Sequence, residues 1–313
     1  MIITKLKGGL GNQMFQYATG FALALKNKTQ QKIDISNYDH VTRVTPRKFA
    51  LNVFNISSPI ALSEEISGIN NGGFLSKLGN FINQKILRNY YLDFHPDFLN
   101  KIGNKITLGK NIYLEGIFQS EKNFAEFTPQ IRQEFTFKKE LFDEKVKQLS
   151  EVLQKENSVS IHIRRGDYVH DKKTNKYHGV CSIEYYQEAI KLIKEKINQQ
   201  KTSSNNTSNI NIIAPTFYIF TDDEKWVTET FAKKEFNEII PTHTNISKNH
   251  FKDYEELYLM SQCQHQIIAN SSFSWWGAWL NKNSDKIIIT PKKWVNKKPN
   301  PHPNIIPETW IKI

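Results

Sequence analysis

Apolar residues near the start of the chain change from a short continuous run to a helical spacing. Residues 2–6 are mostly apolar and predict a strand, which leads into the glycine-rich segment 8–13. Apolar side chains at positions 14, 18, 21 and 25 then recur every three or four residues, as on one face of a helix. A second strand is predicted over residues 31–35. The chain therefore opens with a predicted strand, glycine turn, helix and strand.

The second half of the chain repeats this alternation. Strands are predicted at residues 158–161, 216–221, 266–269 and 286–290, with helical stripes at 183–197 and 254–263 between them. Such alternation is typical of parallel βαβ units, so we predict an α/β fold. Between the two halves, a strand is predicted at 112–115 and a helix over 142–156, whereas residues 41–104 predict no clear element.

A domain boundary is predicted where the helix over 142–156 ends. The two domains would span residues 1–156 and 157–313. The polar segment 199–211 is expected to be an exposed loop. The proline-rich end, 291–313, is expected to be extended and to pack back on the surface.

Composition indicates a globular protein rather than a disordered one. Of 313 residues, 39% are hydrophobic and 12% aromatic, which is enough for two packed domains. The two cysteines, Cys181 and Cys263, indicate no disulfide framework and favour a reducing compartment. No segment approaches the roughly 20 apolar residues that span a bilayer. We therefore expect a cytoplasmic protein.

The net charge of +11 favours anionic partners. Nucleotide phosphates, an anionic membrane surface and nucleic acid all fit that charge. The lysines are dispersed, and no helix-turn-helix, zinc-finger or ribonucleoprotein signature is present, so we expect no nucleic-acid partner. A peripheral contact with an anionic inner-membrane surface stays open.

Polar residues follow three of the predicted strands, at 162–167, 222–223 and 270–274. If the strands are parallel, these segments gather at one edge of one sheet. Ligands bind at that edge in open α/β sheets. The convergence predicts a single site in the second half of the chain.

The first of these segments carries the most chemistry. His162, Arg164, Arg165 and Asp167 emerge together where a buried strand is predicted to end. Arginines are the preferred planar partners of phosphate oxygens, so the segment predicts a diphosphate site. A salt-bridged surface turn is the alternative. We set aside an adhesion role for residues 165–167, because the tripeptide adjoins a strand rather than an exposed loop.

The glycine-rich segment 8–13 is a second candidate. Glycines such as Gly9 and Gly11 bring backbone amides close to a phosphate or a sugar. The segment is neither a Walker loop nor a dinucleotide fingerprint, because Met14 stands where the third glycine would be. A plain turn explains it equally well. Asn12 and Gln13 favour a polar ligand, since their amides can read sugar hydroxyls.

The acidic pair Asp222 and Asp223 has two explanations. Adjacent carboxylates can bind a divalent cation. We favour Asp222 as an acceptor for donors on a base or ribose, because two arginines are already available for the phosphates.

The segment after residue 270 combines hydroxyls with tryptophans. Ser271, Ser272 and Ser274 lie at a predicted helix N-terminus, which favours anions. The tryptophans that follow could form a sugar platform, but core packing is favoured because tryptophan mainly contributes buried area. They are Trp275, Trp276 and Trp279.

Four blocks together resemble the bacterial α-1,2-fucosyltransferases of glycosyltransferase family 11. They are residues 8–17, 114–121, 162–168 and 271–277, in the order found in that family. The resemblance implies a GT-B architecture of two facing Rossmann-like domains with a cleft between them. The first domain would be on the acceptor side and the second would bind GDP-fucose.

The resemblance also implies the reaction. L-Fucose would pass with inversion from GDP-β-L-fucose to O2 of a terminal galactose on an oligosaccharide or glycolipid. The product would be an α-1,2-fucosylated glycan of a surface polysaccharide or lipopolysaccharide. No metal and no other cofactor is expected, since GDP-fucose is a substrate.

Site roles follow from the same resemblance. Arg164 would be the principal β-phosphate ligand, with Arg165 in support. His162 and Asp222 would contact guanine or ribose, and Asn12 would reach the fucose or the phosphate from the first domain. The donor-binding set, in full, is His162, Arg164, Arg165, Asp167, Asp222, Ser271, Ser272, Ser274, Gly9 and Gly11.

The identity of the general base, which takes the proton from the attacking galactose hydroxyl, stays open. Glu115, Asp39 and Asp167 are all candidates, and Asp167 has the alternative role of orienting the arginines. Two other functions also stay open: a nucleotide-sugar-binding module without transferase activity, and a fucosyltransferase with a different acceptor or linkage.

Overall fold

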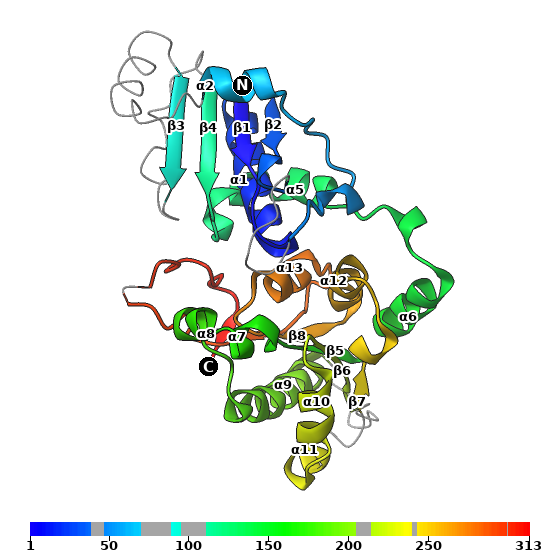
Figure 1. Ribbon diagram of the computed structural model, residues 1–313. Coiled ribbons are helices and arrows are strands. Elements are labelled where there is room, and N and C mark those ends of the chain that lie inside the picture. The colour runs from blue at the N-terminus through cyan, green and yellow to red at the C-terminus, as the bar shows by residue number, and fades with distance from the viewer. Residues whose placement is uncertain (39–46, 70–88, 95–110, 205–213, 240–242, 299) are drawn as a thin grey trace. The chain divides into compact units, whose positions relative to one another are not determined.

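The contacts of the chain divide it into two units (Figure 1). The computed structural model describes residues 1–38, 47–69, 89–94, 111–204, 214–239, 243–298 and 300–313. Unit 1 contains Met1–Lys138 and Pro301–Pro307, and unit 2 contains Lys139–Asn300 and Glu308–Ile313. Each unit has its own parallel sheet with helices against it, so the α/β fold predicted from the sequence is confirmed.

Unit 1 holds a four-stranded parallel sheet in the order β2-β1-β4-β3. Its strands are β1 (Ile2–Lys5), β2 (Gln31–Asp34), β3 (Asn89–Phe94) and β4 (Asn111–Gly116). Its helices are α1 (Leu10–Lys26), α2 (Ser63–Ile69) and α5 (Thr128–Glu134), with short 3-10 turns η1 (Ser36–Tyr38), η2 (Leu51–Val53), η4 (Glu121–Asn123) and η5 (Ala125–Phe127). Helix α1 packs against β1 and β2, so the predicted opening of the chain is confirmed.

Unit 2 holds a six-stranded parallel sheet in the order β10-β9-β8-β5-β6-β7. Its strands are β5 (Ser158–Ile163), β6 (Thr216–Thr221), β7 (His243–Asn245), β8 (His265–Ile267), β9 (Ile288–Thr290) and β10 (Ile311–Lys312). Its helices are α6 (Glu144–Lys155), α7 (Gly166–His170), α8 (Lys172–His178), α9 (Ile183–Ser204), α10 (Glu224–Phe231), α11 (Lys234–Ile239), α12 (Asp253–Gln262) and α13 (Ser272–Leu280), with 3-10 turns η6 (Lys139–Leu141) and η7 (Ser247–Asn249).

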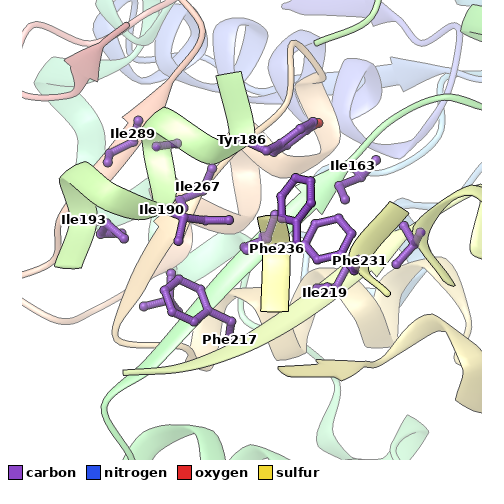
Figure 2. Close-up of a cluster of buried hydrophobic side chains, with 14 of the residues drawn as sticks. Ile163, Tyr186, Ile190, Ile193, Phe217, Ile219, Phe231, Phe236, Ile267 and Ile289 are labelled. Atoms are coloured by element: carbon purple, nitrogen blue, oxygen red, sulfur yellow. The ribbon is translucent and has the colours of Figure 1, made fainter. Parts of the chain in front are cut away.

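Strand β5 lies at the centre of the unit 2 core. All six of its residues are buried, as expected for a strand covered on both faces of a parallel sheet. Ile161 and Ile163 of β5 belong to a cluster with Ile219 of β6 and with Tyr186 and Ile190 of α9 (Figure 2). This packing fixes the end of β5, from which the arginine segment emerges.

The domain boundary that we predict at residue 156 lies inside unit 2. Helix α6 packs against α12 and β5, and the ring of Phe142 stacks on that of Tyr258 with centroids 4.3 Å apart. The contacts of α6 therefore join it to the second unit. Part of the proline-rich end, residues 301–307, belongs to unit 1, where Ser120 Oγ donates a hydrogen bond to the carbonyl of Asn304 at 3.1 Å.

Other elements differ in extent from the sequence prediction. Strand β5 continues through Ile163, so His162 lies within it rather than after it. Helix α9 continues to Ser204, into the predicted loop 199–211, and the rest of that loop lies outside the described residues. The tryptophans after residue 274 pack in the core, as predicted: Trp275 and Trp276 are fully buried and Trp279 nearly so.

Candidate functional site

Three neighbouring strands of unit 2 end in polar residues. Strand β5 lies between β6 and β8, and it pairs in parallel with both. Arg164 follows β5, Asp222 follows β6, and Ser271 lies a few residues after β8. The convergence predicted from the sequence is therefore confirmed, and the shared edge is a candidate ligand site.

Arg164 is held between two carboxylates. Its Nη2 lies 2.6 Å from Oδ1 of Asp167, and its Nη1 lies 2.8 Å from Oδ2 of Asp222. The guanidinium carbon also lies 5.3 Å from the centre of the Tyr168 ring, within the range of a cation–π contact. A guanidinium has five N–H groups, so two ion pairs leave donors for an anionic ligand. These contacts orient the charged head of Arg164 at the end of β5.

Arg165 is fixed by a different set of contacts. Its backbone N–H donates to Oδ1 of Asp222 at 2.7 Å, and its Nε lies 3.0 Å from Oδ2 of Asp223. Its guanidinium carbon lies 4.2 Å from the centre of the Trp226 ring. Oδ1 of Asp223 accepts a hydrogen bond from the Trp226 backbone N–H at 3.1 Å and so caps α10. Arg165 is thus tied to the start of α10, which suits a supporting role.

Asp222 is engaged on both of its oxygens, one by Arg164 and one by the backbone of Arg165. The chain turns tightly against it, because a Cβ on Gly166 would lie 2.5 Å from Oδ2 of Asp222. Among the residues that the structure describes, no three His, Cys, Asp or Glu side chains are grouped to hold a metal ion. A contact of Asp222 with a base or ribose stays a prediction, beside this observed role in holding the arginine segment.

His162 is buried near the end of β5 and is uncharged at neutral pH. Burial, aided by the positive charge of Arg164, lowers the pKa of its imidazole to about 3. Its ring lies 5.7 Å from that of Phe273, at the start of α13. Its Nδ1 is buried and has no hydrogen-bond partner within the described part of the chain. Because an unpaired buried polar atom is costly, a ligand that pairs it would bind more tightly.

The serines after β8 differ in accessibility. Ser271 caps α13, and its Oγ accepts a hydrogen bond from the Phe273 backbone N–H at 3.3 Å. The hydroxyl of Ser274 is buried and donates to backbone carbonyls, including that of Ser271 at 3.3 Å. Ser272, the first residue of α13, is half-buried. Diphosphate binding by the three serines stays a prediction, and Ser274 has a structural function in the turn.

Glu256 on α12 is a residue near the site that the sequence analysis did not single out. It accepts a hydrogen bond from Ser247 Oγ at 2.7 Å, and that hydroxyl accepts one from the backbone N–H of Thr221 at 2.8 Å. Thr221 directly precedes Asp222. Burial, together with nearby negative charge that includes Asp222, raises the pKa of the Glu256 carboxyl to about 7. Glu256 is one of two adjacent glutamates near the start of a helix, a pattern that predicts exposure to solvent. Only the tertiary packing therefore reveals its buried carboxyl.

The stability of the wild-type protein is expected to fall relative to that of a Glu256→Gln variant as the pH rises from 4.5 to about 7. A carboxyl whose pKa is raised on folding binds its proton more tightly in the folded state. Its stabilising contribution is therefore present below this window and is lost across it. The glutamine is neutral throughout and keeps an oxygen for Ser247. Thermal unfolding of both proteins across this pH range measures the effect, with exposed Glu151→Gln as control. A constant difference between wild type and Glu256→Gln would contradict the expectation.

The glycine loop of unit 1 is tied down by amide side chains. Gly8 has a φ of +82°, in the region that favours glycine. Gln13 is fully buried, and its Nε2 donates to the carbonyl of Gly8 at 3.0 Å and to that of Lys48 at 2.9 Å. Oδ1 of Asn12 accepts a hydrogen bond from Nε2 of Gln119 at 2.8 Å. Gln13 thus has a structural role, and Gln119 is a neighbour of Asn12 that the sequence analysis missed.

The backbone of this loop also lies beside an arginine that was not predicted. A Cβ on Gly9 would lie 3.8 Å from Nη1 of Arg47. Gly11 is buried in the first turn of α1. The catalytic assignment of Asn12 and the donor-binding assignments of Gly9 and Gly11 stay predictions.

The three candidates for the proton acceptor have different surroundings. Glu115 in β4 is paired with Lys5 and Lys7, each at 3.4 Å. Asp167 is bound to Arg164, which favours its alternative role of orienting that arginine. Asp39 lies outside the described residues. The identity of the general base stays open among these three residues.

The fold and the arginine-bearing strand end define the class of protein. Two α/β units with parallel sheets of the GT-B type are an architecture of glycosyltransferases. The whole chain, residues 1–313, matches the model of glycosyl transferase family 11, and the protein belongs to that family.

Known proteins similar to this chain support that placement. An alpha-1,2-colitosyltransferase of Escherichia coli is 32% identical and covers 100% of this chain and 99% of its own length. The O-antigen biosynthesis glycosyltransferase WbnK of Escherichia coli is also 32% identical, over 98% of this chain and 99% of its own. A galactoside alpha-(1,2)-fucosyltransferase 2 of Rattus norvegicus is 24% identical over 87% of this chain and 65% of its own.

Among solved structures, POFUT1 in complex with GDP-fucose has a TM-score of 0.50 with this chain. The match covers 92% of this chain and 97% of that one at 11% identity, so it concerns the fold alone. The predicted GT-B type of α/β fold is confirmed. No helix in the described part of the chain is both long and apolar enough to cross a membrane.

Proposed function

We propose that the protein transfers L-fucose from GDP-β-L-fucose to O2 of a terminal galactose, with inversion, and that it acts in the cytoplasm on a bacterial surface polysaccharide. One observation carries this proposal above the others. Arg164 and Arg165 emerge from the central strand of the unit 2 sheet and are oriented there by carboxylates from the next strand, β6. A preoriented arginine pair at the carboxyl edge of an α/β sheet suits the diphosphate of a nucleotide-sugar.

In the proposed donor complex, Arg164 contacts the β-phosphate and Arg165 supports it. The first turn of α13, with Ser271 and Ser272, adds backbone N–H groups and hydroxyls to the diphosphate. His162 contacts the guanine or the ribose. Its unpaired, buried Nδ1 supports that role, because a neutral imidazole can pair with a polar group of the nucleoside.

The chemistry follows from the charge that develops. The bond between C1 of fucose and the β-phosphate oxygen breaks, and the GDP that leaves carries the bonding electrons. The galactose O2 attacks C1 from the opposite face, which inverts the configuration from β to α, and its proton passes to a protein carboxylate. Arginine donors in place before the reaction stabilise the leaving group electrostatically. We propose that they do so without a metal ion.

The names of the relatives support the α-1,2 linkage, and they leave GDP-fucose and GDP-colitose as donors to compare. Two of the three relatives described above carry an α-1,2 transfer in their names, and one of these transfers colitose. Colitose is L-fucose without its 3-hydroxyl. A donor pocket for one sugar therefore needs little change to take the other. GDP-colitose is the second candidate donor, and the acceptor chemistry would be the same.

The test is a transfer assay with purified protein. GDP-fucose and GDP-colitose are each incubated with a panel of terminal β-galactosides and with no acceptor, with and without EDTA. We expect release of GDP that depends on the acceptor, an α-1,2 linkage in the product, a faster reaction with GDP-fucose, and no effect of EDTA. GDP binding without product on any galactoside would indicate a binding module instead. A different linkage, or loss of activity in EDTA, would refute the corresponding part of the proposal.

A further inference from the structure

We infer that one basic face of unit 2 binds the surface of an anionic lipid membrane. This face, the lysine surface, consists of Lys172, Lys173 and Lys176 on α8 and Lys297 and Lys298 on the loop after β9. All five residues are exposed. Figure 1 shows the loop beside α8, although the two are more than a hundred residues apart in the sequence.

Hydrogen bonds hold the two segments of the lysine surface together. The backbone N–H of Asn296 donates to the carbonyl of Tyr177 at 2.7 Å, and its Nδ2 donates to the carbonyl of Asn175 at 3.4 Å. Nζ of Lys297 lies 5.9 Å from the centre of the Tyr177 ring. The lysines of α8 and those of the loop therefore belong to one continuous face of unit 2.

The loop is anchored to the core of the unit. Trp294 and Val295, just before the lysines, are 3% and 4% exposed. The carbonyl of Trp294 accepts a hydrogen bond from Nδ2 of buried Asn270 at 3.2 Å, and the same Nδ2 donates to the carbonyl of His178 at 3.0 Å. One buried amide thus joins the loop to the end of α8. The lysines extend from a fixed scaffold rather than from a loose chain.

The positive charge of this surface is only partly compensated within the described residues, by the carboxylate of Asp171 beside Lys173. None of the five lysines has a carboxylate within ion-pair distance among them. Asp171, which precedes α8, caps the helix by accepting a hydrogen bond from the Thr174 backbone N–H at 2.6 Å. Lys176 lies three and four residues from the other two lysines of α8, so the three share a helix face and repel one another. A partner of negative charge would remove that repulsion.

The composition of the surface favours a membrane over a discrete ligand. Lysine is a compact charge on a flexible stem and does not make the bidentate contacts that arginine makes to single phosphates. The five charges are spread over two segments. A lipid surface that carries many anionic head groups matches such a distribution, and basic clusters of four to eight residues bind such surfaces. The lysine surface contains no arginine, which nucleic-acid recognition commonly uses.

The lysine surface adjoins the arginine site. Nδ2 of Asn175 donates to the carbonyl of Tyr168 at 2.6 Å, and the His178 ring stacks on the Tyr168 ring with centroids 4.6 Å apart. Tyr168 in turn contacts Arg164. Binding through this face would hold the arginine site of unit 2 close to the head groups of the membrane.

The test measures binding of the full chain to lipid vesicles, and it does not depend on transferase activity. Vesicles of phosphatidylcholine with about a third phosphatidylglycerol are compared with pure phosphatidylcholine by co-sedimentation. One variant carries Lys172→Gln, Lys173→Gln and Lys176→Gln. The matched control replaces three exposed lysines elsewhere in unit 2 by Gln and so removes the same charge: Lys147, Lys191 and Lys282. Circular dichroism checks that both variants fold.

Wild type is expected to bind the anionic vesicles, to lose this binding as salt is raised, and not to bind the neutral ones. The variant on α8 should bind roughly 100-fold more weakly, since each of the three lysines near such a surface contributes about 1 kcal/mol. The control should bind like wild type. Equal losses in the two variants, or equal binding to neutral vesicles, would overturn the inference. Binding of a single-stranded oligonucleotide is measured for the same proteins. If the α8 variant lost oligonucleotide binding but still bound anionic vesicles like wild type, the inference would also be overturned.

Discussion

Replacing Arg164 with alanine is expected to lower kcat/KM for fucosyl transfer by about 10²- to 10³-fold. In the proposed reaction the GDP leaving group gains negative charge as the bond to fucose breaks, and Arg164 is the donor nearest to that charge. Loss of one preorganised donor of this kind removes about 2.7–4 kcal/mol of transition-state stabilisation. Steady-state kinetics with GDP-fucose and a β-galactoside measure the loss.

The variant should remain folded. The side chains of Asp167 and Asp222, which lose the guanidinium of Arg164, are 26% and 28% exposed, so water can solvate them. Thermal unfolding checks this. Arg164→Lys keeps the charge but not the planar fork, and we expect an intermediate loss. A value of kcat/KM near that of wild type in Arg164→Ala would refute the phosphate role of Arg164.

The position of the site could be predicted from the sequence because it depends on local pattern and on one rule of topology. The short stretch of residues 158–161, with β-branched Val159 and Ile161, predicted β5. The polar residues after β5, β6 and β8 had to meet once the strands were parallel. The exact end of β5 could not be predicted in this way. His162 alternates with apolar Ile161 and Ile163 but is itself buried, because the sheet is covered on both faces.

The partners within the site could not be predicted, because they depend on contacts between distant parts of the chain. Asp222 and Asp223 each engage an arginine of the preceding βα turn, a pairing that only the tight approach at Gly166 reveals. The raised pKa of Glu256 likewise comes from burial within the folded unit and from nearby negative charge, which no helical pattern encodes. In unit 1 the hydrogen bond between Asn12 and Gln119 spans more than a hundred residues.

The position of the domain boundary could not be predicted from the sequence pattern either. The amphipathic pattern predicts α6 correctly, but it does not say which sheet the helix covers. The contacts of α6 with α12 assign it to unit 2, whereas the predicted boundary follows the end of the helix. Residues 301–307 illustrate the same point, because a proline-rich segment has no periodicity that would indicate its partner.

Replacing Asp222 with alanine is expected to lower kcat by up to about 10²-fold with little change in the preference for GDP over other nucleoside diphosphates. Asp222 joins the guanidinium of Arg164 to the backbone of Arg165, so its loss allows that guanidinium to move. A displacement of about 1 Å can reduce turnover by that factor. Kinetics with GDP-fucose, and competition by GDP, UDP and CDP, measure both quantities. Asp171→Ala, at the cap of the neighbouring helix α8, is the control.

The same experiment separates the two roles considered for Asp222. If Asp222 read the base or the ribose, its loss would raise KM for the donor and relax the preference for GDP, while kcat would change little. If Asp222 acts through Arg164, the double variant Arg164→Ala with Asp222→Ala should be no slower than Arg164→Ala alone, because the two side chains then serve one function. Additive losses in the double variant, or a relaxed nucleotide preference in the single one, would show that Asp222 acts independently of the arginine it holds.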